Sequence, residues 1–242
     1  TIDPTQRAGF GLPDLDSLEE ALPLGGRTEI AMQLDGAVRE LEVDASIGSI
    51  AIQPGEDWSL EGYDLTAPQQ LKYSFADGKL TVSYDLSKIK SDGKGQHDHI
   101  HLTFPKSVQL DEFSLNGGVG TGTLQQLNSK RMELNAGVGS IEAEDVQVSE
   151  KLEVYGGVGL VQISGSFGGE IELNGGVGEI DLTVQGAGED EFDCDIDSGL
   201  GQIRYGNRSV GVVDGEYTVE QGRTKNISVD GGVGDIKVRF EK

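Results

Sequence analysis

The sequence has little cysteine, little proline and no long apolar run. Its 242 residues include one cysteine and six prolines beside 37 glycines. A lone cysteine, Cys194, cannot close an internal disulfide, so cysteine usage does not indicate the compartment. The scarcity of proline excludes collagen, which combines strict Gly-X-Y triplets with abundant proline. Because no stretch of about 18 consecutive apolar residues is present, the sequence predicts no membrane-spanning helix within these residues.

Basic residues are also scarce. Lysine and arginine number 19 against 42 aspartates and glutamates, which gives a formal net charge of −23. A surface this acidic repels nucleic-acid phosphate and anionic membranes, so we expect no nucleic-acid partner. The acidity is typical of a surface that keeps a β-rich protein soluble, and a specific cationic partner is the alternative.

The motifs of nucleotide-binding and hydrolytic enzymes are missing. No G-x-x-x-x-G-K-[S/T] occurs, no G-x-G-x-x-G lies between a strand and a helix, and no serine sits in G-x-S-x-G. The calcium-binding nonapeptide is excluded because Ile180 and Ile236 stand where its ligating aspartate belongs. We therefore predict a non-enzyme with no catalytic residues and no cofactor. A polysaccharide-active β-helix enzyme, using two of the many carboxylates, is the alternative.

One pattern occurs seven times and dominates what is present. Each copy reads apolar-x-apolar, a polar residue or tyrosine, two small residues, an aliphatic residue, glycine, and then renewed alternation. From Gly120 to Gly178 the last glycines are 19, 20 and 19 residues apart, and the spacing then widens to 23 and 33. We interpret the wider intervals as insertions on similar units. The copies start at Leu41, Phe113, Met132, Leu152, Ile171, Cys194 and Ile227.

Each copy predicts two short strands joined by a corner at its glycine. In one copy Met132, Leu134 and Val138 share one parity, whereas Ile141 and Ala143 have the other. A corner glycine between the two sets would let both point inward. Since one copy cannot bury its apolar face alone, copies must stack about 4.8 Å apart.

We predict an all-β fold, a single β-helix-like β-solenoid of GGVG-containing repeats of about 19–20 residues with a β-rich N-terminal half. Residues 1–26 are expected to be a tether with at most one short helix. Residues 27–242 form the solenoid domain, of which 27–112 are less regular and 113–242 carry the regular repeats. Antiparallel hairpins in a sandwich are the alternative.

Stacking in sequence order predicts which residues share a column. We expect one buried column of aliphatic residues in the first strands, a second buried column of the corner valines, and a ladder of side-chain amides beside them. The three columns are Leu134, Val154, Leu173 and Ile196; Val119, Val138, Val158 and Val177; and Asn116, Asn135, Asn174 and Asp197.

Two sets of residues are candidate metal ligands. His97, His99 and His101 alternate on one strand, so their imidazoles share a face that could chelate zinc or simply face solvent. Stacking also places an acid at one outward position of four copies, where carboxylates about 5 Å apart would repel one another. A weakly bound divalent cation would relieve that repulsion, and so would solvation. These acids are Glu133, Glu153, Glu172 and Asp195.

The order of several segments resembles a known family. LEVDASIGSIAI comes early, DGKLTV and HLTFPKSVQLDEFSLNGGVGTGTL follow, and successive GVG-x-I copies end in GDIKVRF. This order is similar to that of the bacterial putative-adhesin family of unknown function, whose β-strand-repeat domain is also called toastrack. The likeness covers about Arg27 to Phe240 and carries no active-site residues.

The resemblance implies an extracytoplasmic β-solenoid at the cell surface or in the periplasm. Members of the family are often tethered by an N-terminal transmembrane helix, which in this protein would precede Thr1, and are associated with envelope-stress systems. The implied function is a non-catalytic interaction module, either adhesin-like or an envelope-stress sensing or scaffold domain. Its implied partner is a protein or a cell-surface glycan.

Overall fold

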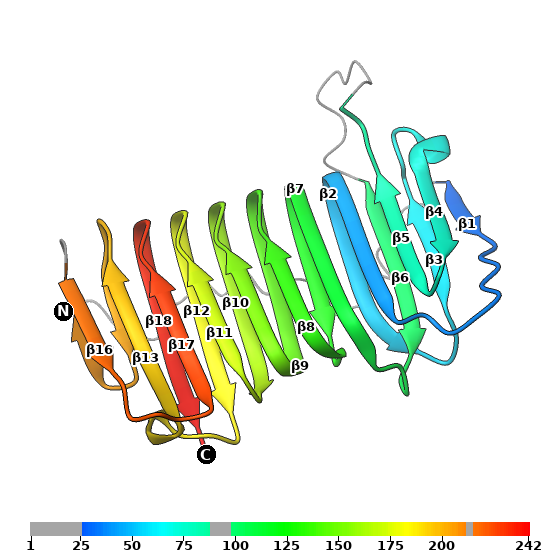
Figure 1. Cartoon of the computed structure of the whole chain (residues 1–242). Helices are drawn as coiled ribbons and strands as arrows, with labels where there is room; N and C mark the ends of the chain where they lie inside the picture. Colours follow the sequence, from blue (N-terminus) through cyan, green and yellow to red (C-terminus); the bar gives the residue numbers. More distant parts are fainter. Residues whose placement is uncertain (1–25, 88–97, 212–214) are drawn as a thin grey trace.

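Two layers of parallel strands run the length of the molecule, and each copy of the repeat contributes to both. A computed structural model of the chain describes residues 26–87, 98–211 and 215–242. Its 18 strands belong to one hydrogen-bonded sheet folded into these layers (Figure 1). The helical segments described are two three-residue 3-10 turns, η1 (Pro68–Gln70) and η3 (Glu189–Glu191). The predicted all-β solenoid is confirmed.

The strands alternate buried and accessible positions, as their sequences predict. They are β1 Arg27–Ile30, β2 Glu40–Gly55, β3 Ser59–Tyr63, β4 Leu71–Ala76, β5 Lys79–Tyr84, β6 His99–Pro105, β7 Leu110–Gln125, β8 Asn128–Asn135, β9 Val138–Tyr155, β10 Val158–Phe167, β11 Glu170–Asn174, β12 Val177–Gln185, β13 Phe192–Ser198, β14 Ile203–Tyr205, β15 Arg208–Val210, β16 Gly215–Val219, β17 Lys225–Asp230 and β18 Val233–Glu241.

The copies pair in parallel, which rules out hairpins as the repeat unit. One layer runs β5–β2–β7–β8–β9–β11–β17–β13. The other runs β6–β2–β7–β9–β10–β12–β18–β14. The long strands β2, β7 and β9 pass through both layers. Antiparallel strands close the two ends: β1, β3 and β4 at one, β15 and β16 at the other.

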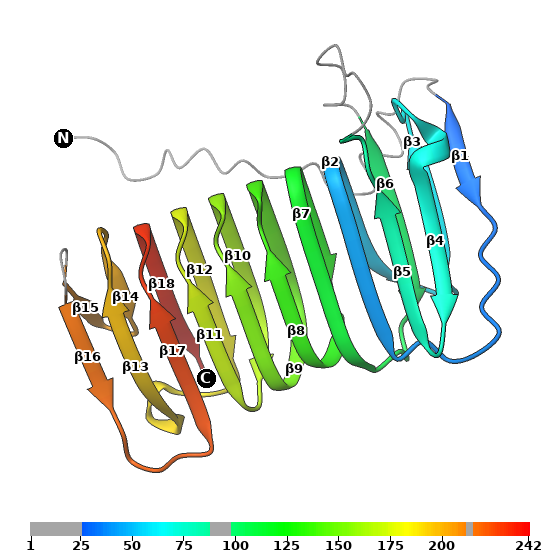
Figure 2. The same ribbon diagram turned by 45° about the horizontal axis from the view of Figure 1, so that its top comes forward.

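The last copy in the sequence is not the last in the stack. Strand β17 pairs with β11 on one side and β13 on the other, and β18 lies between β12 and β14. Figures 1 and 2 show the red C-terminal strands between the yellow and orange ones. The chain therefore builds its terminal coil first and then returns to fill the gap. The wider intervals do carry extra elements, η3 in one and β15 and β16 in the other, but the prediction that the copies stack in sequence order is wrong for the last two.

This order corrects the predicted core column. Leu134, Val154 and Leu173 are neighbours in register, but Val229 separates Leu173 from Ile196. All five side chains are at most 2% exposed. Inward residues of the facing layers, such as Ile141 and Ala143, are equally buried, so the layers share one apolar core. Cys194 is buried in this core as well.

The predicted corner is real, but its valines point outward. Gly139 has a φ of +144°, a conformation that L side chains rarely adopt, so the frame break falls where the sequence placed it. Gly137, with a φ of +58°, bends the chain two residues earlier, and Ala136 rather than Val138 completes the inward alternation. The four valines do stack in register, yet they are 49–54% exposed, and the prediction that they are buried is wrong.

The less regular N-terminal half is continuous with the repeats. Strands β4 and β5 form a hairpin whose turn residues, Asp77 and Gly78, both have positive φ, as a two-residue type I′ turn requires. Asp98 is 1% exposed and is held by the hydroxyl of Tyr84 at 2.6 Å and by the backbone N–H and hydroxyl of Thr66 at 2.8 and 2.9 Å. This buried network ties β5 to the chain entering β6.

Candidate functional site

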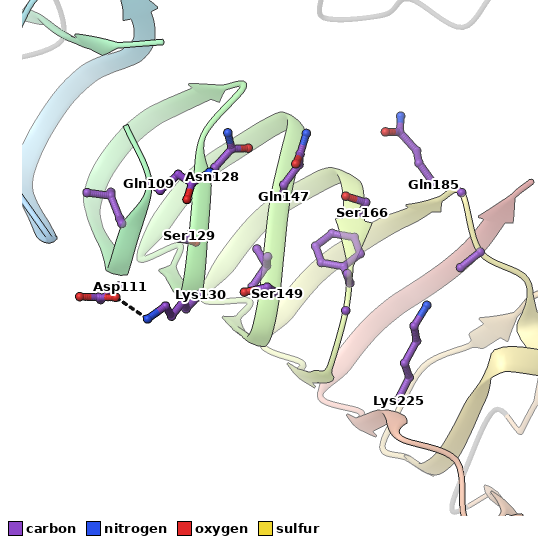
Figure 3. Close-up of a pocket in the computed structure, with 16 residues that line it drawn as sticks. Gln109, Asp111, Asn128, Ser129, Lys130, Gln147, Ser149, Ser166, Gln185 and Lys225 are labelled. Carbon is purple, nitrogen blue, oxygen red and sulfur yellow. Dashed lines mark ion pairs between the residues drawn. The ribbon is translucent and has the colours of Figure 1, made fainter. Parts of the chain in front are cut away.

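A groove of about 640 Å³ lies along the second corner of the coils, where the chain returns from one layer to the other (Figure 3). It crosses five successive turns, and equivalent residues of those turns form its walls and floor. Register places Asn128 beside Gln147 and Gln147 beside Ser166 on one wall, and Leu110 beside Ser129 and Ser129 beside Val148 on the floor. We call this hollow the corner groove.

One wall of the corner groove is a row of uncharged polar side chains. Figure 3 shows the five following one another across the groove. They recur every 19 residues, a period that the sequence carries but that our search for glycine motifs missed. Side-chain amides offer both donors and acceptors, so such a row can hydrogen-bond a polymer of matching repeat. The row consists of Gln109, Asn128, Gln147, Ser166 and Gln185.

The floor is buried and apolar except at one position. Leu110, Val148, Phe167 and Ala187 are at most 4% exposed, and Ser129 is 6% exposed. The Ser129 hydroxyl has no hydrogen-bond partner among the described residues, a state it shares with only one other buried side-chain polar atom there, Tyr205 Oη. A buried unpaired hydroxyl is costly, and a ligand that reached it would remove that cost.

The charged residues of the groove are already paired. Lys130 Nζ lies 2.7 Å from Asp111 Oδ1, and this hydrogen bond and charge lower the pKa of Asp111 and raise that of Lys130. Lys225 Nζ lies 3.0 Å from Glu191, outside the groove. Asp111 is the one carboxylate among the lining residues. The groove therefore lacks the paired acids of a glycosidase and is nearly neutral, in contrast with the chain as a whole.

The predicted histidine set is only partly visible. His97 lies outside the described residues. His99 and His101 share the outer face of β6, as predicted, while Ile100 and Leu102 are buried beneath them. His99 Nδ1 hydrogen-bonds the hydroxyl of Ser49, and the ring of His101 packs edge-on against Tyr63, with centroids 5.4 Å apart. Zinc binding at this face stays a prediction.

The predicted acid ladder is shorter than expected, and a lysine beside it contacts two of its members. Glu133, Glu153 and Glu172 stack in register, but Ser228 lies between Glu172 and Asp195, so including Asp195 in the ladder is wrong. Asp195 instead accepts a hydrogen bond from Thr218 at 2.9 Å.

Lys151 supplies the cation that the stacked carboxylates require. Its Nζ lies 3.0 Å from Glu172 and 3.2 Å from Glu153, which together raise its pKa. In the described part of the chain, no group of three histidine, cysteine or acidic residues is arranged to hold a metal ion.

The amide ladder beside the glycine corner is present at one end of the stack. Asn116 Nδ2 donates to Asp44 Oδ1 at 2.7 Å, and Asn135 Nδ2 donates to Asn116 Oδ1 at 2.8 Å. Tyr155 interrupts the series, and Asp230 separates Asn174 from Asp197 because the last copy is inserted there.

One solved structure shares the fold. A solved structure described as a "putative cell adhesion protein", from Clostridium sporogenes ATCC 15579, is 17% identical and aligns with a TM-score of 0.50 over 90% of this chain and all 100% of its own. A "putative adhesin" from Bacteroides fragilis NCTC 9343 is 15% identical, with a TM-score of 0.36 over 88% of this chain and 95% of its own.

A curated relative matches over a shorter stretch. Uncharacterized protein MJ0340 of Methanocaldococcus jannaschii is 29% identical over 90 residues, 37% of this chain and 38% of that protein. The chain therefore spans well under two thirds of the length of this relative.

A family model accounts for the whole repeat region. The family described as Toastrack DUF4097 matches residues 38–242, from just before β2 to the last residue. Among the described residues, no helix has the length and apolarity needed to cross a membrane. Because the match takes in all seven copies of the repeat, the chain belongs to the Toastrack DUF4097 family.

Proposed function

We propose that this chain is a non-catalytic surface interaction module whose corner groove binds a neutral, hydroxyl-rich polymer, a cell-surface glycan. The observation that carries the proposal is the row of uncharged polar side chains above a floor that holds the unpaired Ser129 hydroxyl. Sugar hydroxyls both donate and accept hydrogen bonds, as do amides, so the row of polar side chains matches such a ligand.

The charge pattern favours a neutral ligand over the alternatives. With Asp111 and Lys225 already paired, the groove offers no unpaired charge to an anionic ligand. The same single carboxylate argues against the polysaccharide-active enzyme, since both hydrolytic mechanisms need two acids facing one bond. Binding along a stack of identical units also suits a repeating polymer.

The name of the Clostridium protein, a cell adhesion protein, agrees with such a role. A surface role would place the domain outside the cytoplasm, with the full-length protein tethered to the membrane. A domain that senses envelope stress must also bind a ligand, so the corner groove would serve that role as well.

An array of neutral and anionic glycans, followed by calorimetry on the strongest neutral hit, tests the proposal. The double substitution Asn128→Ala/Gln147→Ala removes two neighbouring amides and should weaken binding at least about tenfold, roughly 1.4 kcal/mol. Gln162→Ala, at an exposed position of β10 outside the groove, is the matched control and should bind as wild type does. Binding confined to anionic glycans, or binding unchanged in the double variant, would contradict the proposal.

A further inference from the structure

A line of exposed aliphatic side chains runs along the glycine corner of the stack. Neighbouring members are in register from one coil to the next, and each is 49–60% exposed. We call this line the valine ridge. In stack order it consists of Val119, Val138, Val158, Val177, Val233 and Leu200.

The ridge gathers nearly all the exposed apolar bulk of the molecule. The described residues contain seven large hydrophobic side chains that are exposed; six form the ridge, and the seventh, Tyr155, is three residues from Val158. Scattered apolar residues are normal on a protein surface, whereas the largest contiguous apolar patch of a protein often serves a function.

The fold requires the corner glycines but not the valines between them. A Cβ at Gly139 would lie 1.8 Å from the carbonyl oxygen of Gly120, so the stack itself demands glycine there. The side chain of Val138 points to solvent, where a polar residue would cost the fold little. The backbone conformation of the corner therefore does not explain why every ridge position is aliphatic.

The middle of the ridge is free of charge. No charged residue occurs in 116–124, 135–141 or 154–163, the segments around Val119, Val138 and Val158, whereas Glu179, paired with Lys237, stands two residues after Val177. Towards the inserted and terminal coils the flanks become acidic, with Asp230 and Asp235 beside Val233 and Asp197 near Leu200. In a chain of net charge −23, a neutral strip is where two copies can meet without strong repulsion.

We propose that the valine ridge is the contact between two copies of this chain, packed antiparallel about a two-fold axis near Val138. A partner must present side chains about 4.8 Å apart to match the ridge, and a second stack of the same coils does so. With the axis at Val138, Val119 of each copy faces Val158 of the other, as an isologous contact requires. The acidic coils carrying Val233 and Leu200 then lie beyond the paired valines, opposite the N-terminal coils of the other copy.

The available area fits a reversible dimer. A stable interface buries about 800 Å² on each partner, and the half-exposed valines supply only the apolar centre of such a contact. The glycines on both sides of each valine leave the backbone open to close approach, and the neutral flanking residues supply the rim.

Sedimentation of the full chain over a range of concentrations tests the proposal. Wild type should pass reversibly from monomer to dimer as the concentration rises to about 100 μM, an affinity in the micromolar range. Val138→Lys/Val158→Lys should raise the dimer Kd at least about 100-fold by placing unpaired charges in the contact. Ser74→Lys adds a charge at an exposed position of β4, an end strand that carries no ridge residue, and should leave the Kd unchanged.

Single cysteines locate the axis, because the native Cys194 is buried. Under mild oxidation Val138→Cys should form a disulfide-linked dimer readily. Val177→Cys should not, because in the antiparallel arrangement its two copies lie farther apart than the roughly 7 Å that a disulfide spans.

Four results would overturn the proposal: a monomer at every concentration, a dimer unaffected by the lysine pair, equal cross-linking at both cysteines, or a dimer that forms only once residues 1–25 are removed. The last would assign the ridge to the N-terminal segment instead.

Discussion

At the scale of single residues, the corner glycines show the tightest constraint. Gly178 has a φ of +151°, and a Cβ there would lie 1.9 Å from the carbonyl oxygen of Gly159 in the next coil. We expect Gly178→Ala to lower the free energy of unfolding by about 3 kcal/mol or more. Gly36→Ala, where the nearest atoms are 3.8 Å away and φ is not positive, is the control and should cost far less. Equal losses in urea denaturation would contradict this account of the corner.

Ser129 separates stability from binding at one residue. Its buried hydroxyl has no partner, so Ser129→Ala should raise the free energy of unfolding by about 1 kcal/mol. The same change should weaken glycan binding, because the ligand loses the one polar group in the floor. Ser74→Ala, at an exposed position of β4, is the control for losing a serine hydroxyl. If Ser129→Ala is less stable than wild type, the hydroxyl has a structural partner instead.

At the scale of one element, Lys151 on β9 neutralises two neighbouring carboxylates. It contacts Glu153 at 3.2 Å and Glu172 at 3.0 Å. Lys151→Gln should destabilise the fold by about 1 kcal/mol at low salt, since the stacked Glu153 and Glu172 then lack their cation.

In Lys151→Gln, millimolar Ca²⁺ should raise the melting temperature further than NaCl of equal ionic strength does. This excess effect of Ca²⁺ should be larger in the variant than in wild type. Lys72→Gln, at an exposed position of β4, controls for loss of one lysine. Identical effects of Ca²⁺ and NaCl in Lys151→Gln would mean that the ladder is only a solvated acidic face.

Glu142, also on β9, gives the stack a pH dependence. Burial, and then the charge of Glu144, raise the pKa of Glu142 above its ordinary value of 4.5. Its contribution to stability is therefore complete below pH 4.5 and is lost as the pH rises through the raised folded-state pKa. Glu142→Gln should be more stable than wild type at pH 7, and the difference should shrink towards pH 5.

Urea denaturation at several pH values measures this difference. The control is Glu216→Gln, which removes one exposed carboxylate of β16. A stability difference for Glu142→Gln that stayed constant between pH 5 and 8 would contradict the account.

Sequence reasoning worked within a coil and failed between coils. The alternation of Met132, Leu134 and Ile141 predicts both strands, and the corner glycine predicts the bend, because these depend on local parity and backbone angle. Val138 points outward because the chain also bends at Gly137. The repeat pattern shows only a small residue at that position, so it did not predict this bend.

At the scale of the whole molecule, the order of coils was not readable because every copy presents the same apolar edge to its neighbours. The copy at Ile227 fits equally well after the copy at Cys194 or before it, and the return of the chain decides the order. The corner groove was missed for a related reason. Its polar wall recurs every 19 residues, yet only the stack brings Gln109 and Gln185 into one surface.

The most direct test of the corner groove as the binding surface is NMR titration of the full chain with the strongest neutral oligosaccharide from the array. The side-chain amide signals of Gln109, Asn128, Gln147 and Gln185 should shift together with one affinity, while that of Gln162 on β10 stays fixed. Shifts confined to residues outside the groove, or amide signals that do not move at saturating ligand, would contradict the proposed function.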